Sequence, residues 1–221
     1  SININMNNYY VKIMFLFIML FLVLCGNPVR ANLPLQGMVI AIDSGHGGLD
    51  PGSLYNDIYE KDITLSIGKY LEKYLSEMGA TVIMTRTSDS DLSNGVKNHR
   101  KKADFDERIK IINQKIVDMY VSIHLNYLTD TRYYGAQVFY NKDNENLAKS
   151  IQKYLNKNTN TDREIKKIPT STYMYDKLTT KGVLVECGFL SNATERNKLV
   201  TKEYQSEFAK VLAEAISHYY S

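Results

Sequence analysis

Hydrophobic positions along the chain follow two periods. Short apolar runs predict buried strands, and apolar residues three and four positions apart predict amphipathic helices. The predicted strands are MVIAID (38–43), ATVIMTR (80–86), MYVSIHLN (119–126), GAQVFYN (135–141) and GVLVECG (182–188), with a further short strand near 172–177. The predicted helices cover 63–78 (capped by Asp62 and Gly79), 104–115, 145–158 and 202–220.

This alternation of strands and helices predicts an α/β fold. We expect a single domain with a twisted, mostly parallel (mixed) sheet of about six strands and helices on both faces. Reactive groups in such sheets collect beyond the carboxyl ends of the strands. Polar residues lie there three times, as His46, His124 and Glu186. Each could be a structural residue on its own, but their recurrence indicates one site.

The first strand leads into a glycine-rich loop, AIDSGHGGLDPGSLYNDIYEKD (41–62). The loop lacks the Lys-Ser/Thr pair that a phosphate-binding loop places after its glycines. It carries His46 instead and, fourteen residues later, Glu60. Two imidazoles and a carboxylate are a common catalytic zinc set, so His46 and His124 with a carboxylate make a metal site a candidate.

The carboxylates also have structural interpretations. Glu186 interrupts an apolar strand, and a carboxylate is almost never buried without a partner. A buried salt bridge with Arg86 or Arg108 would supply that partner. Glu60 is flanked by charged neighbours, and these residues alone favour a solvated carboxylate near a helix start.

The N-terminal segment has the pattern of an export signal. A polar start with Lys12 precedes an apolar run over 13–25, which is short for a membrane span. Val29 and Ala31 are small residues at the −3 and −1 positions of a cleavage site. We therefore expect residues 1–31 to be a signal peptide, with an uncleaved anchor as the alternative, followed by a catalytic domain over 32–221.

The charge balance argues against nucleic acid as a partner. Loss of residues 1–31 would remove Lys12 and Arg30 and no acidic residue, so the net charge falls from +3 to +1. A nucleic-acid-binding domain would carry a strongly basic face. Only Cys187 would remain, inside an apolar strand, where we expect an inert packing residue and no intramolecular disulfide.

These motifs together resemble a known family. The carriers are IDSGHGG, Glu60 within YEKDITL, VIMTR, SIHLN and LVECGFLSN, spread in order over residues 38–220. They are similar to the type-3 amidase family of zinc-dependent N-acetylmuramoyl-L-alanine amidases. The stretch DLSNGVKNHRKKADFDERIKIIN, the YGAQVFY strand and the compact domain resemble the germination-specific members of that family. Ser44 and Cys187 depart from its usual residues, and neither removes a reactive group.

The resemblance implies roles for four residues. His46, Glu60 and His124 would be ligands of a catalytic Zn²⁺, and Glu186 would be the catalytic carboxylate. The implied reaction is hydrolysis of the amide between the lactyl group of N-acetylmuramic acid and L-alanine in peptidoglycan. In spore formers it would remove stem peptides from cortex glycan, after which a muramic acid deacetylase would permit formation of muramic-δ-lactam. The enzyme would act in the cell wall or the forespore intermembrane space, with an activating protein as a further partner.

Two alternative functions remain open at the level of sequence. One is a vegetative amidase of the same family, used in cell separation or lysis. The other is a non-catalytic wall-binding module, which would be expected to have lost a ligand. The pattern also predicts an open cleft, because only eight residues, 127–134, separate two predicted strands and leave no room for a covering helix.

Overall fold

The computed structural model describes Tyr10, Ile13, Met14 and residues 32–221. Residues Leu33–Ser221 form one compact unit. The expected signal segment, 1–31, lies almost wholly outside the described residues, so its cleavage stays a prediction. Within the described ranges, no helix is long and apolar enough to cross a membrane.

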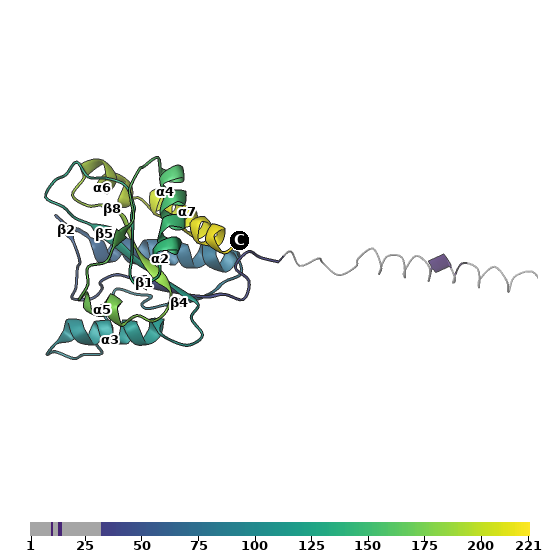
Figure 1. The fold of residues 1–221 in the computed structure, drawn as a ribbon, viewed down its shortest axis with the longest axis horizontal. Helices are drawn as coiled ribbons and strands as arrows, with labels where there is room; N and C mark the ends of the chain where they lie inside the picture. The colour runs from purple at the N-terminus through teal and green to yellow at the C-terminus, as the bar shows by residue number, and fades with distance from the viewer. Residues whose placement is uncertain (1–9, 11–12, 15–31) are drawn as a thin grey trace, which may run out of the picture. The chain divides into compact units, whose positions relative to one another are not determined.

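A six-stranded mixed sheet forms the centre of this unit (Figure 1). Its strands, in spatial order, are β4 (Thr81–Met84), β1 (Val39–Ser44), β5 (Met119–Asn126), β8 (Gly182–Phe189), β6 (Gln137–Tyr140) and β7 (Lys166–Lys167). Neighbouring strands are parallel, except that β6 runs antiparallel to β8. A separate two-stranded sheet pairs β2 (Leu54–Tyr55) with β3 (Ile58–Tyr59). The expected α/β class with a mixed sheet of about six strands is confirmed.

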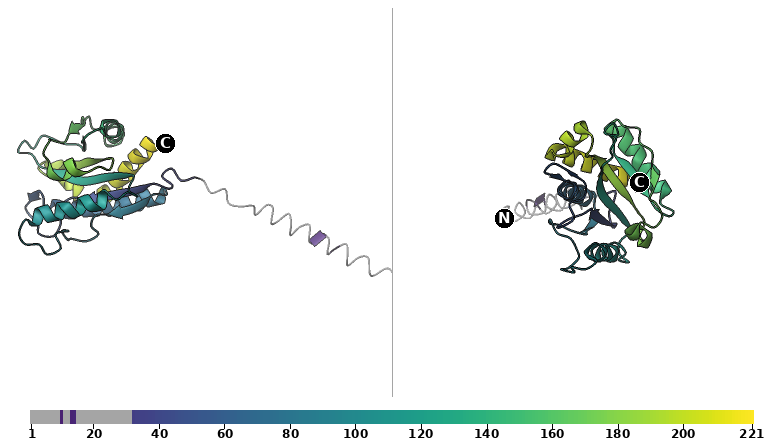
Figure 2. Two further views of the ribbon diagram at one scale, coloured as in Figure 1. Left: turned by 60° about the horizontal axis from the view of Figure 1, so that its bottom comes forward. Right: turned by 90° about the vertical axis from the view of Figure 1, so that its left-hand side faces the viewer.

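Helices cover both faces of the sheet, as expected (Figures 1 and 2). One face carries α2 (Glu60–Glu77), α4 (Glu145–Thr159) and α7 (Lys202–Tyr220), and the other carries α3 (Arg100–Ile112) and α5 (Tyr173–Lys177). The short helix α6 (Ala193–Leu199) follows β8 and contacts α7. Helices α2 and α7 pack closely, although α2 lies in the first part of the described domain and α7 at its end.

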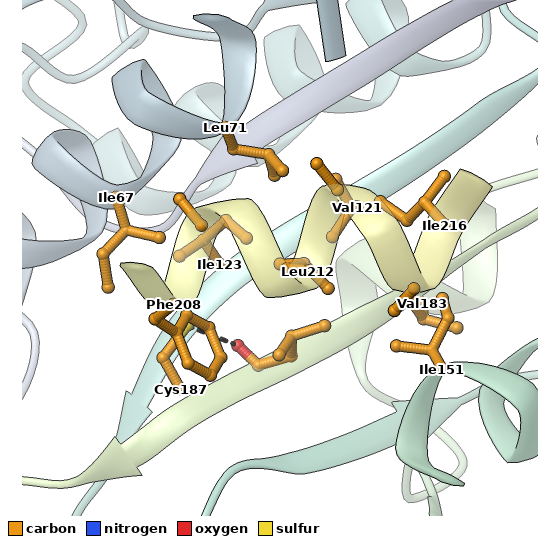
Figure 3. Packing of buried hydrophobic residues seen from close by; sticks show 14 of the residues in the cluster. Ile67, Leu71, Val121, Ile123, Ile151, Val183, Cys187, Phe208, Leu212 and Ile216 are labelled. Carbon is orange, nitrogen blue, oxygen red and sulfur yellow. Dashed lines mark hydrogen bonds between the residues drawn. The ribbon is translucent and has the colours of Figure 1, made fainter. Parts of the chain in front are cut away.

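The larger core lies between the sheet and α2, α4 and α7 (Figure 3). Phe208, Leu212 and Ile216 repeat every four residues along α7 and are at most 2% exposed. Burial of each such side chain contributes about 1.5–3 kcal/mol, which fixes the helix on the sheet. Cys187 is fully buried in this cluster as a free thiol, and burial raises its pKa well above the ordinary value. The expected packing role of this cysteine is confirmed.

Helix α2 begins earlier than the hydrophobic pattern predicts. The pattern gives Asp62 as the cap, whereas the helix begins at Glu60. The backbone N–H groups of Glu60 and Lys61 donate to the carbonyl oxygens of Ser53 and Pro51 at 3.0 and 3.2 Å. These loop carbonyls satisfy donors that a capping side chain would otherwise satisfy, and the earlier start puts Glu60 on the helix.

The segment predicted as a short strand near 172–177 is a helix, α5. Met174 and Tyr175 are neighbours in the chain and are both buried, which an alternating strand does not allow. The backbone N–H of Asp176 donates to the carbonyl of Thr172, as in a helical turn. A pattern this short cannot distinguish a strand from a helix.

Three other differences concern short or polar segments. Strand β7 and helix α6 are not among the predicted elements, and α3 begins at Arg100 rather than at residue 104. The basic first turn of α3 carries no apolar periodicity that would reveal it. Helix α6 does have a local signal, because the Asn192 side chain accepts from the Glu195 N–H at 3.0 Å as an N-cap.

Candidate active site

Three ligating side chains from three different elements meet at the carboxyl ends of the strands. His46 follows β1, Glu60 begins α2 and His124 lies on β5. Glu60 Oε1 lies 3.1 Å from His46 Nε2 and 3.0 Å from His124 Nδ1. Within the described part of the chain, this is the one group of three or more such residues whose ligand atoms all lie within 4.8 Å of one another. Two imidazole nitrogens and one carboxylate oxygen in this arrangement suit a divalent cation such as Zn²⁺.

The Glu60 side chain is buried, and both of its carboxylate oxygens accept hydrogen bonds. It is 2% exposed, its Oε2 accepts from the Ser53 N–H at 2.7 Å, and its Oε1 accepts from the Leu125 N–H at 2.9 Å. Burial alone would raise its pKa, but His124 and His46 hold the pKa of this carboxyl far below its usual range. Glu60 is therefore an anion at neutral pH, and its interpretation as a solvated carboxylate is wrong.

Two glycines of the loop make room for the cluster. A Cβ atom at Gly45 would lie 2.3 Å from His124 Cε1, closer than real contacts allow. A Cβ atom at Gly52 would lie 2.6 Å from His46 Cδ2 and 2.7 Å from Glu60 Oε2, and Gly52 also has a φ of +68°. The glycine-rich loop therefore brings the backbone against the ligating side chains.

We expect Gly45→Ala to weaken Zn²⁺ binding by about 10-fold or more, because the added methyl group must displace the His124 ring. Titration against a competing chelator measures the affinity, and circular dichroism checks the fold. Gly95→Ala is the control: its φ of +80° strains an alanine, but its Cβ would meet nothing within 4 Å and the residue lies outside the cleft lining, so zinc affinity should not change. Equal zinc affinity of the Gly45 and Gly95 variants would contradict the role given to Gly45.

The second nitrogen of His46 faces another carboxylate. His46 Nδ1 lies 3.1 Å from Asp50 Oδ2, and Asp50 Oδ1 accepts from the Gly52 N–H. Burial would lower the pKa of His46, but Asp50 and Glu60 raise it to about 9. A cation at His46 must therefore compete with a proton, so metal affinity falls at acid pH. Sequence reasoning missed Asp50, although its place four residues after His46 in the loop was a signal.

Glu186 lies beside the cluster on the neighbouring strand. It pairs with His124 in the parallel register of β8 and β5, and with Gln137 across β6. Its Oε2 is buried and has no hydrogen-bond partner among the described residues. Burial raises the pKa of this carboxyl to about 7. A carboxyl in this environment can hold or release a proton near neutral pH.

Neither of the two arginines considered as partners reaches Glu186. The Arg108 guanidinium donates to Asp43 at 2.7 Å and to Asp104 at 2.9 Å. Arg86 donates to backbone carbonyls, including those of Ser44 and Lys61. The interpretation of Glu186 as half of a buried salt bridge with either arginine is wrong.

We expect Arg108→Met to destabilise the domain by about 3–5 kcal/mol, because it leaves Asp43 and Asp104 buried without their cation. Arg108 is 2% exposed, so solvent cannot replace the lost charge. Urea unfolding measures the loss. Arg132→Met is the control: its side chain is 89% exposed and pairs with Asp130 in solvent, so its replacement should leave the unfolding midpoint close to that of the wild type. Similar losses for both variants would contradict a structural role for the buried pair.

The cluster opens into a cleft of about 490 Å³. Its lining includes the three candidate ligands and Glu186, together with Asp50, Gly52, Ser53, Lys101, Leu125, Asn126 and Tyr127. Residues 127–134, between β5 and β6, contain no helix, which confirms the expected open site. A larger hollow of about 830 Å³ lies against α4, α6 and α7 and contains none of the four candidate residues.

The remaining histidines lie apart from the cleft lining. His99 precedes α3, is exposed and has a φ of 58°. His218 lies on α7, with its ring centroid 5.6 Å from that of Tyr154. Both side chains are exposed, and neither brings an imidazole to the ligand cluster.

Comparison with known proteins places the chain in a family. Residues 40–218 match the family described as N-acetylmuramoyl-L-alanine amidase. The germination-specific N-acetylmuramoyl-L-alanine amidase of Bacillus subtilis (strain 168) is 41% identical over 197 residues, covering 86% of this chain and 83% of that relative.

Solved structures agree with this assignment. The CwlD amidase from Clostridioides difficile, solved in complex with the GerS lipoprotein, has a TM-score of 0.76 and 36% identity, covering 82% of this chain and 98% of that one. The catalytic domain of CwlV from Bacillus (Paenibacillus) polymyxa var. colistinus has a TM-score of 0.70 and 27% identity, covering 82% and 97%. The chain therefore belongs to the N-acetylmuramoyl-L-alanine amidase family, close to its germination-specific members.

Proposed function

We propose that this chain is a zinc-dependent amidase that cleaves the bond between the lactyl group of N-acetylmuramic acid and L-alanine in peptidoglycan. His46, Glu60 and His124 hold the zinc ion, and Glu186 is the catalytic carboxylate. The observation that carries the proposal is the convergence of the three ligand atoms beside Glu186 in an open cleft.

The donor set fits zinc. Two nitrogens and one oxygen leave a fourth position for water or substrate, as in catalytic zinc sites. A zinc ion held by these three residues would supply Lewis-acid chemistry: a lower pKa for a bound water molecule and polarisation of the scissile carbonyl.

Glu186 is the general base and the general acid in this reaction. Its free Oε2 accepts a proton from the attacking water and then delivers it to the nitrogen of the leaving L-alanine. A carboxyl pKa near 7 suits both transfers, because the group can bind and release a proton at neutral pH. Lys101 also lines the cleft, with a side chain 61% exposed and its Nζ 3.7 Å from Asp50 Oδ2, so its charge is shared with that carboxylate at the cleft entrance.

The direct test is mass analysis of peptidoglycan fragments before and after incubation with the purified domain. The expected products are glycan without stem peptides and free peptides that begin with L-alanine. A wall-binding module without catalysis would retain the fragments unchanged. That outcome would overturn the proposal.

We place the activity in the spore cortex and the cell wall, outside the cytoplasmic membrane. The 41% identity with a germination-specific amidase supports the cortex over vegetative cell separation. Muropeptides of spores from a deletion strain distinguish the two: loss of muramic-δ-lactam indicates the cortex, since a muramic acid deacetylase needs glycan freed of peptide. Export through the segment 1–31 predicts a mature chain beginning at or near Asn32, which N-terminal sequencing would detect.

An accessory protein is part of the proposal. The similar CwlD structure was solved with a lipoprotein, which supports a lipoprotein as the partner of this chain. Copurification from sporulating cells would test that association.

A further inference from the structure

A chain of buried hydroxyl groups runs from the second nitrogen of His124 into the protein interior. His124 Nε2 lies 3.4 Å from the Tyr175 hydroxyl, which lies 3.0 Å from Ser122 Oγ. Ser122 Oγ lies 2.6 Å from Asp43 Oδ2. Tyr175 is on α5, Ser122 on β5 and Asp43 on β1, so three elements contribute to the chain of groups.

Asp43, at the buried end of this series of hydroxyl groups, determines which atom donates each hydrogen bond. Asp43 is 1% exposed, and its Oδ1 accepts from Arg108 at 2.7 Å and from Thr85 at 2.9 Å. A carboxylate paired with a guanidinium is ionised and can only accept hydrogen bonds. The single hydroxyl proton of Ser122 must therefore point to Asp43.

The remaining protons follow in order. Because the hydroxyl group of Ser122 donates its one hydrogen bond to Asp43, it can only accept a hydrogen bond from the Tyr175 hydroxyl. The Tyr175 hydroxyl proton is then engaged with Ser122. The Tyr175 oxygen therefore accepts a hydrogen bond from the N–H at His124 Nε2. A neutral imidazole that carries its proton on Nε2 has a lone pair on Nδ1. Nδ1 is the atom 3.0 Å from Glu60 Oε1, on the side of the ligand cluster.

We propose that Tyr175 is a positioning residue, which together with Ser122 and Asp43 holds His124 in the Nε2–H tautomer and directs Nδ1 at the zinc site. Nothing in the sequence motifs of the family resemblance includes Tyr175, which lies in the segment predicted as a strand. Arg108 extends the same framework to the first ligand, since its Nη2 donates to the His46 carbonyl at 2.7 Å. This inference rests on the proposed zinc site.

The test compares zinc affinities of three variants with the wild-type domain, by competition with a chromophoric chelator. Tyr175→Phe keeps the ring and removes the acceptor, so the dissociation constant for zinc should rise about 10-fold. Ser122→Ala should also weaken binding, because the Tyr175 proton is then free to turn towards His124 Nε2 and favour the wrong tautomer. The double variant should match Tyr175→Phe alone, because Ser122 acts only through the Tyr175 hydroxyl.

Tyr120→Phe is the matched control. Tyr120 belongs to the same buried cluster as Tyr175 and is fully buried, but its hydroxyl lies 3.5 Å from Asn141 and not near His124. It should keep the wild-type zinc affinity. Thermal midpoints measured in excess chelator report the stability of the metal-free domain. They show whether a variant has lost stability in general, separately from its zinc affinity.

The outcomes separate this inference from the proposed function. A wild-type domain that binds no zinc would overturn the proposed function. Zinc binding by the wild type with equal affinities for Tyr175→Phe and Tyr120→Phe would overturn the positioning role alone. Additive effects of Tyr175→Phe and Ser122→Ala would also overturn it. If Tyr175→Phe does not fold, unchanged affinity of Ser122→Ala overturns the role, and weakened affinity supports it.

Discussion

Glu186→Gln is expected to lower kcat by about 10²–10⁴-fold while the protein keeps its zinc. The substitution preserves volume and much of the hydrogen-bonding capacity, but an amide cannot accept the proton of the attacking water. The three candidate ligands are unchanged, so bound zinc should stay near one ion per chain. Turnover on peptidoglycan and metal analysis of the same preparation measure both quantities.

The stability of this variant distinguishes a catalytic from a structural carboxylate. Burial raises the pKa of Glu186 from 4.5 to about 7 in the folded protein. The folded state therefore binds this proton more tightly than the unfolded state, and the associated stability is lost as pH rises from 4.5 to about 7. Without zinc, Glu186→Gln should be more stable than the wild type at pH 8, where the buried charge is unpaired. This difference should shrink towards pH 4.5.

Glu195→Gln provides the matched control for the chemistry. Glu195 follows the same strand and accepts from the Phe189 N–H at 2.8 Å, but it lines the other hollow rather than the cleft. Its replacement should leave turnover near the wild-type value. An active but destabilised Glu186→Gln variant would return Glu186 to a structural role.

Removal of zinc is expected to abolish hydrolysis, and added zinc should restore it. His124→Ala should lower both bound zinc and turnover, because it removes one of three ligands. The loss should exceed the roughly 10–100-fold effect typical of groups that only orient a ligand. Metal analysis and turnover before and after chelation test the prediction.

His218→Ala is the control for histidine replacement. His218 lies on α7 beside Tyr154 and outside the cleft lining, so zinc and turnover should stay at the wild-type level. Hydrolysis that persists after thorough metal removal would rule out the zinc mechanism for this chain.

Several predictions from sequence depended on local pattern and are confirmed. The strand that ends near His46 and the strand that contains His124 were identified because their apolar runs are long and uninterrupted. The convergence of His46 and His124 followed from the rule that parallel strands end at one edge of a sheet. The predicted strand near 172–177 was wrong because a segment of six residues carries too little periodicity, and that error concealed Tyr175.

The sequence by itself determined the α/β class and the main strands and helices, and it singled out His46, His124 and Glu186 at strand ends. Glu60 joined them only through the resemblance to the amidase family. Periodicity and residue chemistry are local properties, so they can be read directly from neighbouring positions. Only the tertiary structure decided that Glu60 is buried, that Arg108 pairs with Asp43 rather than Glu186, and that Tyr175 faces His124. Those facts depend on strand order and on helix α5 folding against the sheet, which bring together residues 51 or more positions apart.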